Sequence, residues 1–176
     1  MNIFILILAF FASLQLQTLE VYATPALCAD NVTEGYSDWT TLRNAFGNLV
    51  MPSNAILTLC PNSVVQNHDE EFMGLQILAG GNILLQCGND GSRKNKCVIA
   101  SVGEGSHITM GGDSNFDSIT RNITVKGIKF KQATVVPSIV INSILGKGTY
   151  SFIDCIWEVS LYMLDVCLYL AQWIVR

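Results

Sequence analysis

The sequence predicts an all-β solenoid, a fold in which short strands stack turn upon turn, with one amphipathic helix ahead of the strands. The first observation is that the chain from Ala55 onward consists of brief apolar bursts separated by Gly, Asn, Asp and Ser. Bursts of three or four residues are too short for helices and indicate strands. The second observation is that the bursts recur at a nearly constant interval, which is typical of stacked repeats.

The positions of the apolar bursts give the interval of this repeat. They lie at 56–59, 83–85, 98–99, 108–110, 123–125, 139–141 and 150–152. Leu57 and Ile83 are 26 residues apart, while Ile83 and Ile108, like Val98 and Ile123, are 25 residues apart. An interval of roughly 20–30 residues indicates that each turn of the chain returns above the last.

The clearest repeat matches the segment ITVKGIKF with the segment YSFIDCIW. The alignment places three pairs 27 residues apart: Val125 and Phe152, Ile128 and Cys155, and Phe130 and Trp157. Lys126-Gly127 and Ile153-Asp154 interrupt the two segments at the same place, and a glycine permits the positive φ of a tight corner. Gly80-Gly81 and Gly111-Gly112 are further expected corners. A β-sandwich is the alternative, but its strands carry a longer alternation of apolar and polar residues.

A helix is expected at 38–46, before the strands begin. Ser37 or Asp38 is suited to cap its first turn, and Gly47 is expected to end it. Its apolar face consists of Trp39, Leu42 and Phe46, at helical spacing.

The composition indicates a globular chain and argues against a nucleic-acid-binding protein. Hydrophobic residues make up 50% of the sequence and charged residues 14%, so there is material for a core. The formal net charge is −4 at pH 7. The sequence has no run of Lys or Arg longer than Arg93-Lys94, whereas nucleic-acid binding calls for a basic stripe.

Residues 1–23 are predicted to be a signal peptide. Residues 3–16 are apolar, and Val21-Tyr22-Ala23 suits cleavage after Ala23. No Lys or Arg precedes the apolar run, which leaves a buried core segment or a membrane anchor as alternatives. We therefore expect a secreted, extracellular protein with no membrane attachment once the signal is removed.

Cysteine usage supports an oxidising destination. All six cysteines follow residue 23, and an even number in a secreted chain is typical of a disulfide framework. We expect two disulfides, Cys28 with Cys60 and Cys87 with Cys97, the second closing the polar loop GNDGSRKNK at its base. Cys155 is expected to face inward as a thiol or to pair with Cys167. Glycosylation sequons occur at Asn31 and Asn122.

Four segments, AILTLCP, NILLQCGNDGS, NITVKGIKF and SFIDCIWE, resemble coils of right-handed parallel β-helix proteins of the pectate-lyase-like superfold. The chain is similar, over residues 35–158, to uncharacterised secreted β-helix-domain proteins of algae. The resemblance implies a short right-handed parallel β-helix over 55–158. It also implies that the capping region 24–54 places its helix over the N-terminal end of the coil, which otherwise exposes unpaired strand edges.

A calcium site is a weak possibility at 113–118. Asp113, Asn115 and Asp117 stand at alternate positions, as oxygen ligands do in the first half of a calcium-binding loop. Ser118 replaces the glycine of such a loop and Thr124 replaces its bidentate Glu. A solvated loop therefore explains the segment better, and it also explains the cluster His68, Asp69, Glu70 and Glu71.

No catalytic residue is assigned from motifs, and the sequence favours a protein without enzymatic activity. The resemblance implies enzymes with closely set aspartates or with calcium-binding aspartates and a basic residue, but here Asp113 follows Gly-Gly without a second Asp. The alternative is a calcium-dependent lyase or hydrolase of uronate-rich polysaccharide. Its candidate residues are Asp113, Asp117, and Lys126 or Lys129.

The function expected from the sequence is a non-catalytic structural or glycan-binding role at the cell exterior, with asparagines displayed along one face of the coil. An ice-contacting surface ranks last, because Thr-x-Thr ladders do not recur. The apolar tail at 159–176 is expected to cap the coil. A truncated solenoid and a membrane anchor are the alternatives for this tail.

Overall fold

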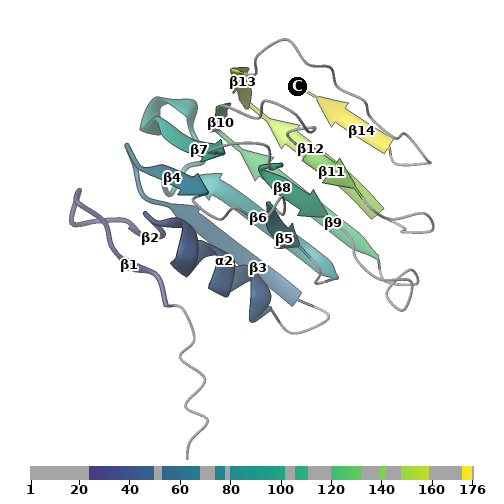
Figure 1. The fold of residues 1–176 in the computed structure, drawn as a ribbon, viewed down its shortest axis with the longest axis horizontal. Helices are drawn as coiled ribbons and strands as arrows, with labels where there is room; N and C mark the ends of the chain where they lie inside the picture. The colour runs from purple at the N-terminus through teal and green to yellow at the C-terminus, as the bar shows by residue number, and fades with distance from the viewer. Residues whose placement is uncertain are drawn as a thin grey trace, which may run out of the picture.

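The computed structural model describes residues 24–49, 53–67, 74–77, 80–101, 106–110, 120–131, 139–141, 148–158 and 172–175. These residues form three parallel sheets, a small antiparallel ribbon and one α-helix (Figure 1). The predicted signal peptide lies outside the described residues. The all-β class is confirmed, and the β-sandwich alternative is wrong, because every pairing within the three large sheets is parallel.

The strands of each sheet come from successive parts of the chain. The five-stranded sheet contains β3 (Ser53–Leu59), β6 (Gly81–Cys87), β9 (Arg121–Lys126), β12 (Gly148–Ile153) and β14 (Gln172–Val175). The four-stranded sheet contains β4 (Val64–Asn67), β7 (Cys97–Ser101), β10 (Ile128–Lys131) and β13 (Ile156–Glu158). The three-stranded sheet contains β5 (Leu75–Ile77), β8 (Ile108–Met110) and β11 (Ile139–Ile141). From β3 to β12 the chain visits the five-, four- and three-stranded sheets in turn.

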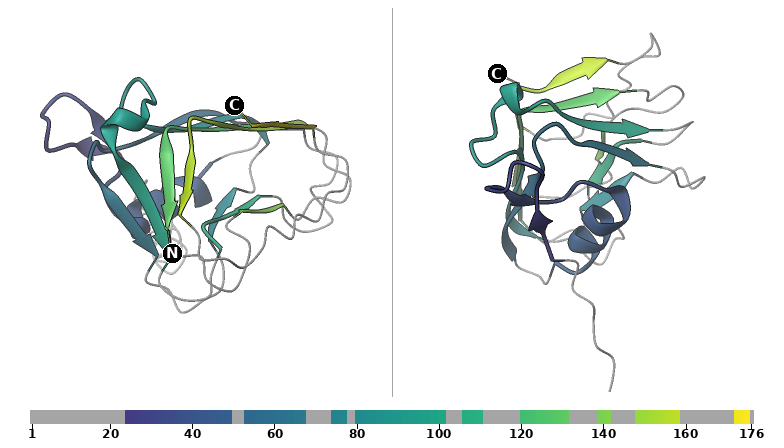
Figure 2. Two further views of the ribbon diagram at one scale, coloured as in Figure 1. Left: turned by 90° about the horizontal axis from the view of Figure 1, so that it is seen from above. Right: turned by 90° about the vertical axis from the view of Figure 1, so that its left-hand side faces the viewer.

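The three sheets surround one apolar interior (Figure 2, left). Alternate residues of each strand face inward, because side chains alternate between the two faces of a sheet. In the five-stranded sheet one inward row is Leu57, Leu85, Val125 and Phe152, at paired positions of β3, β6, β9 and β12. In the four-stranded sheet the corresponding row is Val65, Ile99, Phe130 and Trp157.

The corners between the five- and four-stranded sheets are tight, and several use a left-handed residue. Gly127 separates β9 from β10 with φ of 70°, and Asp154 follows β12 with φ of 54°. Asn62 has φ of 61° after β3. The predicted corners at Lys126-Gly127 and Ile153-Asp154 are thus confirmed. Asn and Asp are the residues that best replace glycine at positive φ.

The predicted register is confirmed in one part of the sheets and wrong in another. Phe152 pairs with Val125 and Trp157 with Phe130, as expected. The other predicted neighbours are not paired: Leu57 pairs with Leu85, Ile83 with Ala55 and Ile123, Ile108 with Leu75 and Ile139, and Val98 with Val64 and Lys129. The uniform interval fails because the turns differ in length. Partner residues in the five-stranded sheet are 28, then 40, then 27 residues apart.

The helix lies at Trp39–Gly47 (α2) and contacts β4 and β5. The carboxylate of Asp38 caps it by accepting a hydrogen bond from the Thr41 backbone N–H at 2.9 Å. Gly47 is its last residue but not a left-handed stop, because the following residue, Asn48, has a φ of −91°. The residues of α2 that are buried against the sheets are Trp39, Leu42, Ala45 and Phe46.

The segment before α2 forms a ribbon of β1 (Ala26–Leu27) and β2 (Glu34–Gly35), which leads into a bridge from Tyr36 to Leu59 of β3. At the other end, β14 pairs with β12, so the described part of the tail continues the five-stranded sheet. No helix within the described residues is long and apolar enough to cross a membrane.

Candidate functional site

The outer face of the five-stranded sheet carries a row of stacked polar side chains, which we call the asparagine ladder: Asn54, Asn82, Asn122 and Thr149. They occupy paired positions of β3, β6, β9 and β12. Asn82 Nδ2 donates a hydrogen bond to Asn54 Oδ1 at 2.8 Å, and Asn122 Nδ2 donates to Asn82 Oδ1 at 3.0 Å. Thr149 Oγ1 donates to Asn122 Oδ1 at 3.1 Å. The ladder therefore runs unbroken across four strands.

Parallel, in-register stacking produces this ladder, because identical amides one strand apart place a donor next to an acceptor. Each amide has two N–H donors and an oxygen with two lone pairs. The bond to Asn54 and the bond from Asn122 use one donor and one lone pair of Asn82. Asn82 is solvent-exposed, so its second donor and second lone pair can bind a hydroxyl group. The ladder thus offers preoriented hydrogen-bonding groups at the strand spacing of about 4.8 Å.

Two further outward rows complete the same face. One consists of Ile56, Leu84, Thr124 and Ser151, and the other of Thr58, Gln86, Lys126 and Ile153. Ile56 is 70% exposed, so the face combines apolar area with amides and hydroxyls. Small-molecule sites commonly combine apolar area with a few placed polar groups. A sugar ring matches such a mixture, because it has hydroxyls at its edge and C–H groups on its faces.

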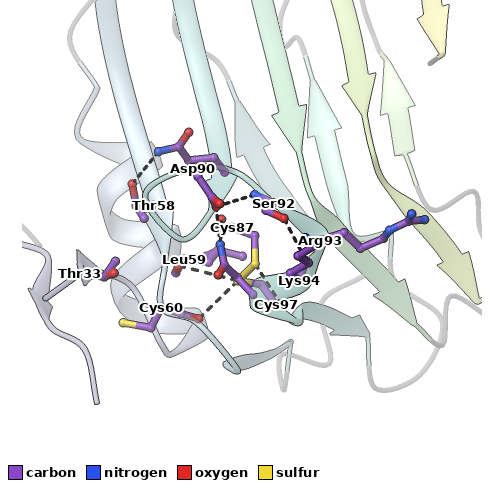
Figure 3. Close-up of a disulfide and its surroundings, with 12 residues drawn as sticks. Thr33, Thr58, Leu59, Cys60, Cys87, Asp90, Ser92, Arg93, Lys94 and Cys97 are labelled. Atoms are coloured by element: carbon purple, nitrogen blue, oxygen red, sulfur yellow. Dashed lines mark hydrogen bonds between the residues drawn. A yellow bond between two sulfur atoms is a disulfide. The ribbon is translucent and has the colours of Figure 1, made fainter. Parts of the chain in front are cut away.

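A loop closed by a disulfide lies at the corner between β6 and β7 (Figure 3). Cys87 and Cys97 are bonded at its base, and the 3₁₀-turn η1 (Arg93–Asn95) lies within it. The Asp90 carboxylate accepts hydrogen bonds from the Ser92 backbone N–H at 2.8 Å and from Asn95 Nδ2 at 2.6 Å. These bonds hold the pKa of Asp90 below its usual value. The loop is therefore fixed by covalent and polar contacts.

Both disulfides join the pairs that the sequence indicated: Cys28 with Cys60, and Cys87 with Cys97. Cys155 is a free, partly buried thiol, and Cys167 lies outside the described residues. Burial raises the pKa of the Cys155 thiol. A raised pKa leaves little thiolate at neutral pH, so this sulfur is a poor nucleophile.

The two sequons lie in different settings. Asn31 is exposed in a turn with φ of 57°, where the Thr33 hydroxyl donates to the Asp30 carboxylate at 2.7 Å. Asn122 lies in the middle of the asparagine ladder. Glycosylation at both positions remains a prediction.

Several buried polar residues were not expected from the sequence. His107 is fully buried, and its Nε2 lies 2.6 Å from the carbonyl oxygen of Lys131. Burial lowers the pKa of His107, and the hydrogen bond to Lys131 opposes this only in part. Arg121 is also buried, and its charge partly offsets the rise in the pKa of Tyr150 caused by burial. A histidine or arginine at an inward position gives no sequence signal beyond the strand alternation.

The residues considered for calcium binding or catalysis fall mostly outside the described part of the chain. This is so for Asp113, Asn115, Asp117, His68, Asp69, Glu70 and Glu71. Lys126 and Lys129 are described. Lys126 Nζ donates to the carbonyl oxygen of Asp90 at 2.9 Å, and Lys129 forms an ion pair with Glu158. Among the described residues, no three His, Cys, Asp or Glu side chains are grouped to hold a metal ion.

No protein-family model, curated protein or solved structure matches this chain. The resemblance to the pectate-lyase-like superfold and to secreted β-helix-domain proteins of algae is therefore wrong as a family assignment. The segments that carried it are short apolar strands ending in a corner residue. Any chain that stacks parallel strands and turns between sheets needs such segments, so they reflect geometry rather than common ancestry.

Proposed function

We propose that this protein is a secreted, non-catalytic β-helix with a structural or glycan-binding role at the cell exterior. Its asparagine ladder and the two neighbouring outward rows form the binding face. The scaffold supplies a rigid surface with repeating polar groups, and no chemical step on the ligand is involved.

The order of the strands supports a β-helical path for the chain. Strands β3, β4 and β5 enter the three sheets in turn, and β6, β7 and β8 then pair with them one level further along. Connections between parallel strands of one sheet are right-handed in roughly 98% of cases, which favours a right-handed coil. The disulfides and the predicted signal peptide support an extracellular location, because disulfides persist in oxidising compartments.

The observation that carries the glycan-binding proposal is the asparagine ladder. A hydrogen-bonded row of amides on an exposed sheet is already oriented, so a ligand loses little additional side-chain entropy when it binds. Repeated amides at the strand spacing suit an extended ligand with repeated hydroxyl groups. A linear polysaccharide has that chemistry.

The test is a glycan array probed with the secreted mature chain, with and without calcium, while absorbance reports unsaturated uronide product. We expect binding to a set of linear polysaccharides, independent of calcium and without product. Product formed only with calcium would overturn the non-catalytic proposal in favour of a lyase. Absence of binding to every glycan would remove the glycan-binding role and leave the structural one.

A further inference from the structure

The fold gathers cationic side chains that are scattered in the sequence into one surface, which we call the basic ridge. The sequence has ten Lys and Arg residues. Six of them belong to the ridge, from the loop between β6 and β7, the end of β9, and β10: Arg93, Lys94, Lys96, Lys126, Lys129 and Lys131.

Contacts between the loop and the next turn of the chain bring the two groups together. Lys126 Nζ donates to the Asp90 carbonyl oxygen at 2.9 Å. A side chain at Gly127 would overlap the backbone of Gly91, so the corner before β10 packs directly against the loop. Ile128 of β10 pairs with Cys97, the last residue of the loop's disulfide. The cations of β10 therefore begin where the loop ends.

The ridge keeps an excess of positive charge after its ion pairs are counted. Arg93 Nε lies 3.2 Å from Asp154 Oδ1, and Lys129 and Lys131 both pair with Glu158. With Asp90, three carboxylates contact six cations. Lys94 and Lys96 are exposed, and within the described residues no carboxylate pairs with either side chain. Lys129 and Lys131 alternate along β10 on the outer face, about 6–7 Å apart.

The loop that carries Arg93, Lys94 and Lys96 is preorganised. The Cys87–Cys97 disulfide closes it, and Asn95 Nδ2 donates to the Cys87 carbonyl oxygen at 2.9 Å. Arg93 is also held by its backbone N–H, which donates to Asp154 Oδ2 at 3.3 Å. Fixed cations at defined spacing bind an anionic chain with less ordering cost than cations on a flexible segment.

We infer that the basic ridge binds a linear anionic polysaccharide, through its sulfate or carboxylate groups. The inference rests on the proposed glycan-binding function and gives its ligand a charge class. The chain as a whole carries a net charge of −4. Its overall field repels a polyanion, so attraction is confined to the ridge, and the anionic groups must be matched locally. This favours a discrete polysaccharide segment over nucleic acid, which calls for a long basic surface.

The test measures the affinity of the secreted full chain for dextran sulfate, polygalacturonate and neutral dextran at several NaCl concentrations. We expect binding to at least one of the two polyanions, weakening as salt rises. Binding to only one of them identifies the anionic group. The variant Lys94→Gln with Lys96→Asn is expected to bind about fivefold more weakly, because it removes two exposed charge contacts. Asn is chosen at 96 because Lys96 has a φ of 56°.

Two controls separate charge from structure. Arg43→Gln removes an exposed cation from α2, away from the ridge, and is expected to bind like the wild type. Lys94→Arg keeps the charge and is also expected to bind like the wild type. Unchanged affinity of the double variant would overturn the inference, as would tighter binding to single-stranded RNA or to phosphatidylserine vesicles. Binding to neutral glycans without any binding to polyanions would overturn the inference while leaving the proposed function intact.

Discussion

The two faces of the five-stranded sheet are built from the same strands but have opposite character. The inward row of Leu57, Leu85, Val125 and Phe152 is apolar and almost fully buried. The outward row is the asparagine ladder, whose hydrogen bonds lie at the surface. Because side chains alternate in a strand, neighbouring residues fall on different faces. Stability and ligand binding are therefore separable by substituting adjacent residues.

The largest expected effect is on the inward face, for Leu85→Ala. Leu85 is fully buried, and Leu→Ala changes in cores cost about 2–5 kcal/mol in the free energy of unfolding. Leu84, the next residue along β6, faces outward and is only partly buried, so Leu84→Ala should cost less than about 1 kcal/mol. Urea unfolding of both variants measures the difference. Equal costs would contradict the assignment of the two faces.

Removal of the disulfide at the corner loop is expected to have the next largest effect. The variant Cys87→Ala with Cys97→Ala should lower the free energy of unfolding by about 2–3 kcal/mol, because the bond closes a short loop in the unfolded chain. The same variant should weaken polyanion binding, since the ridge loses its fixed loop. Cys155→Ala, which removes a free thiol, is the control and should leave polyanion affinity unchanged. Thermal unfolding and the dextran sulfate titration measure the two effects.

A smaller effect is expected from pH, through His107. Burial lowers the folded-state pKa of His107 below its ordinary value of 6.5. The unfolded chain therefore binds a proton at pH values where the folded chain does not. The stabilising contribution is fully present above about pH 6.5 and is lost as pH falls from there towards the folded-state pKa. Unfolding measured between pH 7.5 and 5.0 should show this loss in the wild type.

His107→Gln provides the control for that pH dependence. The variant should be less stable at pH 7.5 and should lose less stability on acidification than the wild type does. The pKa values of Asp30, Asp38, Asp90 and Glu158 are lowered by hydrogen bonds, so these groups act only at lower pH. An unchanged pH dependence in the variant would show that another group is responsible.

The sequence predicted the strands that are apolar and the turns that are equal in length. The match of Val125 with Phe152 is correct because the connection between their strands adds no extra residues to the 27-residue turn. The interval fails between Ile83 and Ile123, where the turn is 40 residues long. Loop length varies without a signal in the strands themselves, so a constant interval cannot locate the partner strand.

Two strands were missed for a different reason. In β4, Val64 faces solvent at 57% exposure while the buried Asn67 occupies an inward position, so the strand lacks an apolar burst. In β5, only Leu75 and Ile77 face inward across three residues. The asparagine ladder had a signal, because an Asn precedes an apolar pair or residue at 54, 82 and 122. Only the register shows that these residues contact each other.

The smallest expected effect on stability is also the most direct test of the proposed binding face. Asn82→Ala removes two exposed hydrogen bonds of the ladder, so it should cost less than about 1 kcal/mol in the free energy of unfolding. The measurement is the affinity of this variant for the polysaccharides that the wild type binds on the array, with Asn44→Ala on the exposed side of α2 as the matched control. The proposal predicts that Asn82→Ala binds at least about tenfold more weakly while Asn44→Ala binds normally. Normal binding by Asn82→Ala would contradict the assignment of the glycan site to the asparagine ladder.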